Sequence, residues 1–444
     1  MVSEFEGDSR WFPGFVKTTF EEYLRCGVLA HGFCRVRCED CGDERLLAFS
    51  CKRRGVCGSC DGRRMADTAA HLADNVLPKV PYKQWTLSYP RKIRFVLAKY
   101  PALISKALKL ALSSISNHQR LMARRAGLQG SKTGAITMVQ RFGSSVNLNI
   151  HFHSLLPDGV FVKKQDSIEF HSLPKPTEEQ MLKICIRIYK RTMAMLERED
   201  CLEDEPESLD QIYADSMQTG FSFNRWQEPQ VLPAPKKGRG ASALVDGFSS
   251  HAGGVIHQND RQSLEHVLRY GLRPPISSER LSYDVHSVRY KLRKANLQGK
   301  MELKFEPVEF LRRLCSLIPP PRQNLTRYHG VFASQHAWKK LLAPKVKTPG
   351  RVSCGHEEAT APEANHCYRL NWSKLLKRVF EIDVTVCQKC DGQAKVIATI
   401  KDPPVVVRIL KHLGLEHRPP SRAPPKPQSF DQSSQIEYDY QESA

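Results

Sequence analysis

The chain has 444 residues, with 67 lysines and arginines against 47 aspartates and glutamates and a formal net charge of +20. Its length allows two or three domains, each with its own core. A charge this large favours a nucleic-acid partner over the alternative that the charge serves only to keep the protein in solution. No apolar run of membrane-spanning length is present and the first residues do not read as a signal peptide. We therefore expect a cytoplasmic, nucleoid-associated protein with no membrane partner.

The first 80 residues are rich in cysteine and arginine. Cytoplasmic cysteines indicate metal ligands or free thiols, because disulfides are rare in that compartment. Cys38 and Cys41 form one Cys-x-x-Cys pair and Cys57 and Cys60 a second, at the spacing of a four-thiolate zinc site. Such a site is structural, since four thiolates leave no open position for a substrate. We expect residues 1–80 to be a zinc-binding, DNA-binding domain.

Three further cysteines complicate this assignment: Cys26, Cys34 and Cys51. Cys51 could replace one of the four ligands, or bind a second ion together with His71. A third Cys-x-x-Cys pair near the end of the chain would need ligands upstream of it. That pair is Cys387 and Cys390, and its possible partners are Cys354, His356, His366 and Cys367.

Beyond the cysteine block, the spacing of apolar residues predicts a mixture of helices and strands. Helices are expected over residues 102–125, 177–197, 261–270 and 307–317, and strands near 85–89, within 135–161, and over 249–256 and 285–292. Prolines at 319–321 indicate a boundary. The expected division is 1–80, 81–318 and 319–415, followed by a disordered tail at 416–444.

One of the predicted strands carries a pair of histidines. His151 and His153 alternate with Phe152, so a strand places both imidazoles on one face and the phenyl ring on the other. Two imidazoles so placed can share one metal ion. The alternative is an ordinary strand with two hydrogen-bonded histidines, and the pair alone does not decide between the two.

Five segments carry a resemblance to a known family. They lie at residues 21–33, 48–55, 140–159, 325–332 and 378–384. Together they resemble the rolling-circle (HUH endonuclease) transposases of the insertion sequence 91 family, and most closely the single-tyrosine enzymes of common-region elements. The resemblance implies an α+β fold, in which a small zinc-binding domain precedes an antiparallel-sheet nuclease domain with flanking helices.

The resemblance also implies roles for individual residues. His151 and His153 match the family's metal motif, and Tyr270 matches its nucleophile segment. Two-tyrosine members have their second tyrosine four residues earlier, where this chain has His266, which indicates the one-tyrosine type. A magnesium or manganese ion would orient the scissile phosphate. Tyr270 would then form a covalent phosphotyrosine and leave a free 3′ hydroxyl.

Other site residues follow from their positions around this motif. The third metal ligand is left open between Gln140 and His251, which lie on neighbouring predicted strands. Arg269 and Arg273 flank the tyrosine and are expected to bind phosphate. The reserve nucleophiles are Tyr290 and Tyr328.

The expected protein is a bacterial transposase that cleaves and rejoins single-stranded DNA at transposon ends and at its target. No Walker-type phosphate loop is visible, so strand unwinding would fall to a host helicase. One alternative is a plasmid replication initiator or relaxase with the same nuclease site. Another is a non-catalytic zinc DNA-binding protein, a decayed transposase that retains only its zinc and its charge.

Overall fold

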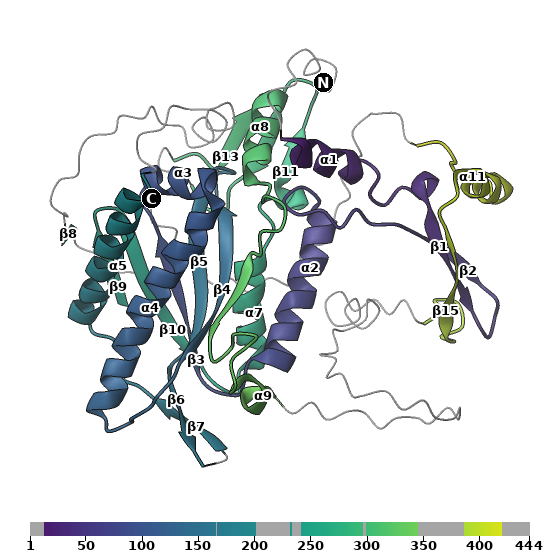
Figure 1. Cartoon of the computed structure of the whole chain (residues 1–444). Helices are drawn as coiled ribbons and strands as arrows, with labels where there is room; N and C mark the ends of the chain where they lie inside the picture. Colours follow the sequence, from purple (N-terminus) through teal and green to yellow (C-terminus); the bar gives the residue numbers. More distant parts are fainter. Residues whose placement is uncertain are drawn as a thin grey trace.

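The structure is a computed structural model that describes residues 13–165, 167–200, 231–232, 241–295, 299–344 and 386–419. Within these residues, a large body and a small module are each built on an antiparallel sheet (Figure 1). This confirms the expected α+β class. Most of the tail expected after residue 416 lies outside the described residues. So do four possible zinc ligands: Cys354, His356, His366 and Cys367.

The body is organised around a seven-stranded sheet in which the adjacent strands β4 (Gly134–Phe142) and β5 (Leu148–Pro157) are buried along almost their whole length. Such continuous burial is expected where helices cover both faces of a sheet. In spatial order the strands are β14 (Thr326–Gly330), β4, β5, β3 (Tyr82–Ser88), β10 (Phe248–Ile256), β9 (Ala241–Val245) and β8 (Val231–Leu232).

One face of this sheet is covered by helices that carry the main core. They are α3 (Arg91–Lys99), α4 (Pro101–Arg125) and α5 (Glu178–Arg198). Phe152 of β5 is fully buried in this core, as the strand periodicity predicts. The start of α5 is fixed by a capping box, in which Thr177 and Gln180 satisfy each other's backbone N–H groups. None of the helices in the described ranges has both the length and the apolar character that a membrane span requires.

The opposite face of the sheet is covered by α2 (Gly58–His71), its continuation at Leu72–Val76 and α7 (Arg261–Leu272) (Figure 1). Leu264 and Leu268 of α7 pack onto Ile136 and Met138 of β4 and Leu155 of β5. Alternation along β5 puts both histidines on this same face. The helix that carries Tyr270 therefore lies over the strand that carries the histidines.

Smaller elements complete the body. They are α1 (Gly14–Tyr23), the hairpin β6 (Gly159–Lys164) and β7 (Ser167–Ser172), the sheet β11 (Leu281–Tyr283), β12 (Val288–Lys291) and β13 (Glu302–Phe305), α8 (Pro307–Leu317) and α9 (Lys339–Leu342).

The small module combines residues from both ends of the chain. Its sheet has the order β15 (Ala394–Ile400), β1 (Phe33–Cys38) and β2 (Glu44–Ala48). Its core forms where Val406 and Leu410 of α11 (Pro403–His412) bury Phe33. The expected separate domain at 319–415 is thus divided, because β14 joins the large sheet and β15 joins β1. Composition along the chain could not show these non-local pairings.

The close approach of α7 to the sheet can be tested by substituting Gly271, with Gly62 of α2 as a comparison. A Cβ at Gly271 would lie 2.4 Å from Cε of Met138, whereas a Cβ at Gly62, in α2, would meet no atom within 4 Å. We expect Gly62→Ala to stabilise the protein by about 0.5–1 kcal/mol through helix propensity. Gly271→Ala is expected to destabilise it by about 1–3 kcal/mol, because overpacking outweighs that gain. Thermal unfolding midpoints that rise in both variants would contradict the close approach.

Candidate functional site

His151 and His153 form a buried pair beneath α7. Their Nε2 atoms lie 3.1 Å apart, and their rings meet edge to face with centroids separated by 4.8 Å. Nitrogen ligands bind small cations at about 2.0–2.1 Å, so two nitrogens that share an ion stand about 3 Å from each other. The pair therefore suits a single metal ion.

Neighbouring groups orient both rings. His151 Nδ1–H donates to the carbonyl of Asn149 at 2.9 Å, which leaves the lone pair of its Nε2 toward His153. Nδ1 of His153 lies 2.6 Å from the side-chain amide nitrogen of Gln84, whose Oε1 is buried and accepts no hydrogen bond from the described residues. Rotating that amide by 180° lets its oxygen accept from His153 Nδ1–H, which frees Nε2 to bind a cation.

The surroundings also set the charge of His153. Burial, His151 and Arg273 together hold the pKa of His153 well below its usual value. His153 is therefore a neutral imidazole at physiological pH, the form that binds metal ions.

Gln140 on β4 lies directly opposite His151 on β5. Its buried Nε2 donates to the carbonyls of Tyr270 and Gly271, each at 2.9 Å, while its Oε1 accepts no hydrogen bond from the described residues. A buried carbonyl oxygen without a donor is costly, and a cation would relieve that cost. Gln140 thus fits the role of third ligand.

The alternative third ligands are less well placed. His251 lies on β10, separated from β5 by β3, and its Nδ1 is 2.8 Å from Oγ of Ser242. Within the described part of the chain, no aspartate, glutamate, cysteine or further histidine forms a three-residue ligand cluster with the histidine pair. The geometry therefore favours Gln140 over His251.

Tyr270 occupies the last turn of α7, where its ring meets that of His153 edge to face at a centroid distance of 5.4 Å. The guanidinium of Arg273 lies 4.8 Å from the centre of the Tyr270 ring and 5.2 Å from that of Phe142. Arg269 instead forms a 2.6 Å ion pair with Glu265 one turn back along the helix. The structure thus brings Arg273, more than Arg269, to the tyrosine and the histidines.

The two reserve tyrosines lie elsewhere. Tyr290 is 1 % exposed and belongs to the hydrophobic core of the body. Tyr328 lies on the edge strand β14 opposite Ile136, and its side chain is 37 % exposed. Among the ring contacts of the described residues, Tyr270 is the tyrosine that meets the histidine pair.

The structure divides the four predicted zinc ligands between two separate groups. Cys57 and Cys60 lie with Cys26 and Cys51, whereas Cys38 and Cys41 lie with Cys387 and Cys390. The prediction that Cys38, Cys41, Cys57 and Cys60 share one ion is corrected by this arrangement. The physical reason is that the β1–β2 hairpin carries the first pair away from the start of α2, where the second pair lies.

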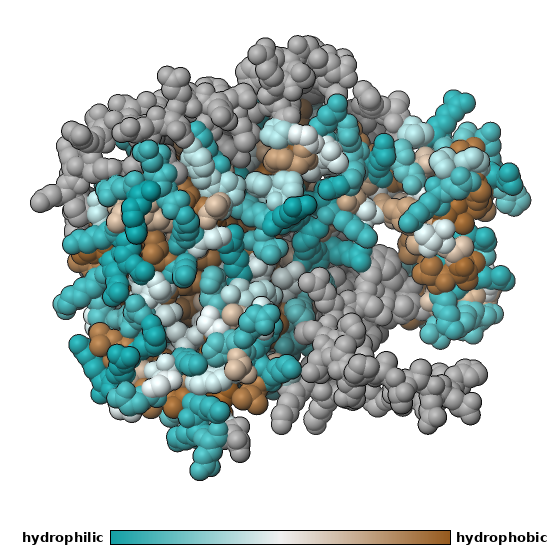
Figure 2. Space-filling model, in the orientation of Figure 1, coloured by the Kyte–Doolittle hydropathy of each residue, from teal (hydrophilic) through white to brown (hydrophobic). Residues whose placement is uncertain are grey.

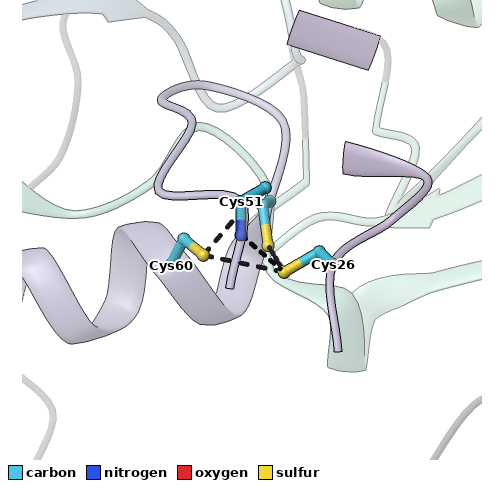
Figure 3. A group of neighbouring side chains, drawn as sticks. Cys26, Cys51 and Cys60 are labelled. Carbon is cyan, nitrogen blue, oxygen red and sulfur yellow. Dashed lines mark hydrogen bonds between the residues drawn. The ribbon is translucent and has the colours of Figure 1, made fainter. Parts of the chain in front are cut away.

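The first group brings four thiols together at the start of α2. Figure 3 shows three of these residues, Cys26, Cys51 and Cys60. Sγ of Cys26 is 3.6 Å from that of Cys57 and 3.8 Å from that of Cys60, and Cys51 Sγ is 3.6 Å from Cys60 Sγ. Thiolates bound tetrahedrally to zinc, with bonds of about 2.3 Å, lie at similar separations. Cys51 thus replaces one predicted ligand, which was one of the two options open from the sequence.

The fourth member of this group, Cys26, could hardly be predicted from the pattern of cysteines. Cys26 stands 25 residues before Cys51 and belongs to no Cys-x-x-Cys pair. The backbone N–H of Cys51 donates to Sγ of Cys26 at 3.3 Å. His71, the other partner considered for Cys51, instead lies with its Nδ1 3.4 Å from the amide of Asn75.

Within the first group, the thiols differ in acidity. A hydrogen bond from Cys57 lowers the pKa of the Cys60 thiol, and burial raises the pKa of the Cys51 thiol. The thiolate form of Cys60 is thus favoured even without a metal ion. The positive charge of a bound cation would favour the thiolate form of the other cysteines as well.

Two family models match the chain. A transposase zinc-binding domain of the insertion sequence 91 type matches residues 6–89, and the Y2_Tnp transposase family matches residues 134–339. No curated protein and no solved structure matches.

These matches, with a zinc-binding region that precedes an antiparallel-sheet body, define a DNA-cleaving and strand-transferring enzyme. The chain is a transposase of the insertion sequence 91 type.

Proposed function

We propose that this transposase cleaves and rejoins single-stranded DNA through a covalent link to Tyr270, in rolling-circle transposition. The observation that carries the proposal is the edge-to-face contact between Tyr270 and His153, at a centroid distance of 5.4 Å. It lies where a phenol meets two imidazoles whose Nε2 atoms converge. A nucleophile next to a metal-binding pair is the arrangement that phosphodiester transfer requires.

The reaction follows from these groups. The phenolic oxygen of Tyr270 attacks the phosphorus, and the bond between the phosphorus and the 3′ oxygen breaks. The tyrosine loses its proton and the 3′ oxygen gains one, so the products are a phosphotyrosine and a free 3′ hydroxyl. The reverse attack by a 3′ hydroxyl rejoins DNA without a separate energy source, because the link retains the phosphodiester energy.

Charge at the phosphate is balanced by two kinds of group. A magnesium or manganese ion held by His151, His153 and Gln140 would polarise the scissile phosphate. Arg273, whose guanidinium lies against the Tyr270 ring, is placed to stabilise the negative charge that develops in the transition state. Arg269 is engaged with Glu265, so we assign it a smaller part.

The enzyme fits the one-tyrosine type. Four residues before Tyr270, α7 carries the exposed His266 instead of a second tyrosine. One nucleophile then serves successive transfers, and duplex unwinding would be supplied by a host helicase.

The nucleophile can be tested with labelled single-stranded DNA from the origin end of the element, incubated with manganese. We expect a covalent adduct on a denaturing gel, lost by at least about 100-fold in Tyr270→Phe and in His151→Ala/His153→Ala. Tyr328→Phe is the matched control and should retain the adduct, because Tyr328 lies on the edge strand β14. An adduct that survives Tyr270→Phe would move the nucleophile to another residue. Tight DNA binding with no adduct in the wild type would favour a non-catalytic protein.

A second prediction concerns the metal site alone. Gln84 orients His153, so Gln84→Leu is expected to weaken manganese binding about 10–100-fold. Thr86→Val removes a longer contact, 3.4 Å from the same nitrogen, and should weaken binding less. Titration followed by electron paramagnetic resonance measures the affinity. Equal affinity in wild type and Gln84→Leu would show that the amide does not orient a ligand.

A further inference from the structure

Cys38 and Cys41 lie in a tight turn that is nearly repeated by Cys387 and Cys390. In the first turn, the N–H of Cys38 donates to the carbonyl of Asp43 and the N–H of Gly42 to that of Cys38. In the second, the N–H of Cys387 donates to the carbonyl of Gly392 and the N–H of Asp391 to that of Cys387.

The backbone conformations of the two turns agree as well. Gly42 and Asp391 follow the second cysteine of each pair, and both have positive φ, +74° and +56°. For a non-glycine residue such as Asp391 this conformation is uncommon and needs support from its surroundings. The N–H of Lys389 also points to Sγ of Cys387 at 3.4 Å. Two facing Cys-x-x-Cys turns of this kind are the knuckles of a zinc ribbon.

The four sulfur atoms of the two turns converge. Cys38 Sγ is 3.6 Å from Cys390 Sγ, and Cys41 Sγ is 3.6 Å from Cys387 Sγ. Each contact joins one turn to the other across 346 or more residues of sequence. Disulfide bonds would require sulfurs about 2.05 Å apart, whereas thiolates around a zinc ion stand at the separation found here.

Neighbouring side chains hold the two turns together. Lys389 is paired with Asp43 of the opposite turn, and Lys395 forms a 2.6 Å ion pair with Glu39. The N–H of Glu39 also donates to the carbonyl of Gln393 at 2.8 Å. The turns are thus positioned by their own contacts, and the sulfurs are brought together as a result.

The small module has little core with which to hold itself closed. Its cluster of fully buried residues contains only Phe33, Val406 and Leu410 within the described ranges. Val396 and Ile397 of β15 are 61 % and 47 % exposed, and Figure 2 shows apolar colour on the surface of this module. Small units of this kind generally need a metal ion or a disulfide for stability.

We propose that Cys38, Cys41, Cys387 and Cys390 bind a second structural zinc ion, which fastens the carboxy-terminal segment to the amino-terminal module. The matched zinc-binding domain ends at residue 89 and does not include half of these ligands. The site is independent of the first cysteine group and of the proposed nuclease site. Its four thiolates make it structural.

The metal content of the full chain tests this site. We expect about two zinc ions per chain, one for each four-thiolate group, and about one in Cys387→Ser/Cys390→Ser. Cys34→Ser is the matched control and should keep about two, because Cys34 lies on β1 and contacts Thr399 instead of either group. Cys390→His should also keep both ions, since imidazole can serve as a fourth ligand. Two ions in Cys387→Ser/Cys390→Ser would overturn the proposal.

Thiol alkylation read by mass spectrometry shows which cysteines share an ion. In Cys38→Ser/Cys41→Ser, we expect Cys387 and Cys390 to react at least about ten times faster than in the wild type. Cys60 should stay protected in that variant until a strong chelator is added, which also shows that the protein remains folded. Unchanged protection of Cys387 and Cys390 would overturn the proposal. So would wild-type disulfides between the two turns, revealed by a mass change on reduction.

Discussion

The hydrogen bonds from Gln140 to the end of α7 hold the candidate site together. One amide nitrogen donates to the carbonyls of both Tyr270 and Gly271, which lie in the last turn of α7, where carbonyls need partners from outside the regular helix pattern. Gly271 allows this approach, since a side chain at that position would meet Met138. The same contact that satisfies the helix end therefore brings the tyrosine ring to His153 and leaves the Gln140 oxygen for another partner.

The first cysteine group is linked to this site by the packing of α2 against α7. Cys57 and Cys60 lie at the start of α2, and the far end of that helix packs through Ala69 and Leu72 into the cluster that contains Leu264 and Leu268 of α7. A zinc ion at the cysteine group would fix the start of α2, and α2 would in turn support the helix that carries Tyr270. The zinc-binding region is thus part of the scaffold that supports the candidate functional site.

The parts of the site that follow from local sequence could be predicted, and the parts that depend on distant pairing could not. Alternation along one strand was enough to predict that His151 and His153 share one face of β5, whereas the roles proposed for them and for Tyr270 came from the resemblance. The cysteine sets were not, because Cys-x-x-Cys spacing identifies a turn but not the turn it faces. Cys38 faces Cys390 only because β15 pairs with β1, and no periodicity in the sequence reports that pairing.

Joining the two ends of the chain carries an entropic cost that grows slowly with the length of the intervening chain. The β1–β15 ladder, the packing of α11 on Phe33 and the ion pairs of Lys389 and Lys395 all oppose that cost. Each of these is modest by itself, since the ion pairs are exposed and the core is small. A zinc ion that binds only the closed arrangement would add its binding free energy to closure. The association of the two ends of the chain would then depend on zinc and on reduced cysteines. It would therefore respond to the zinc concentration and the redox conditions in which the transposase acts.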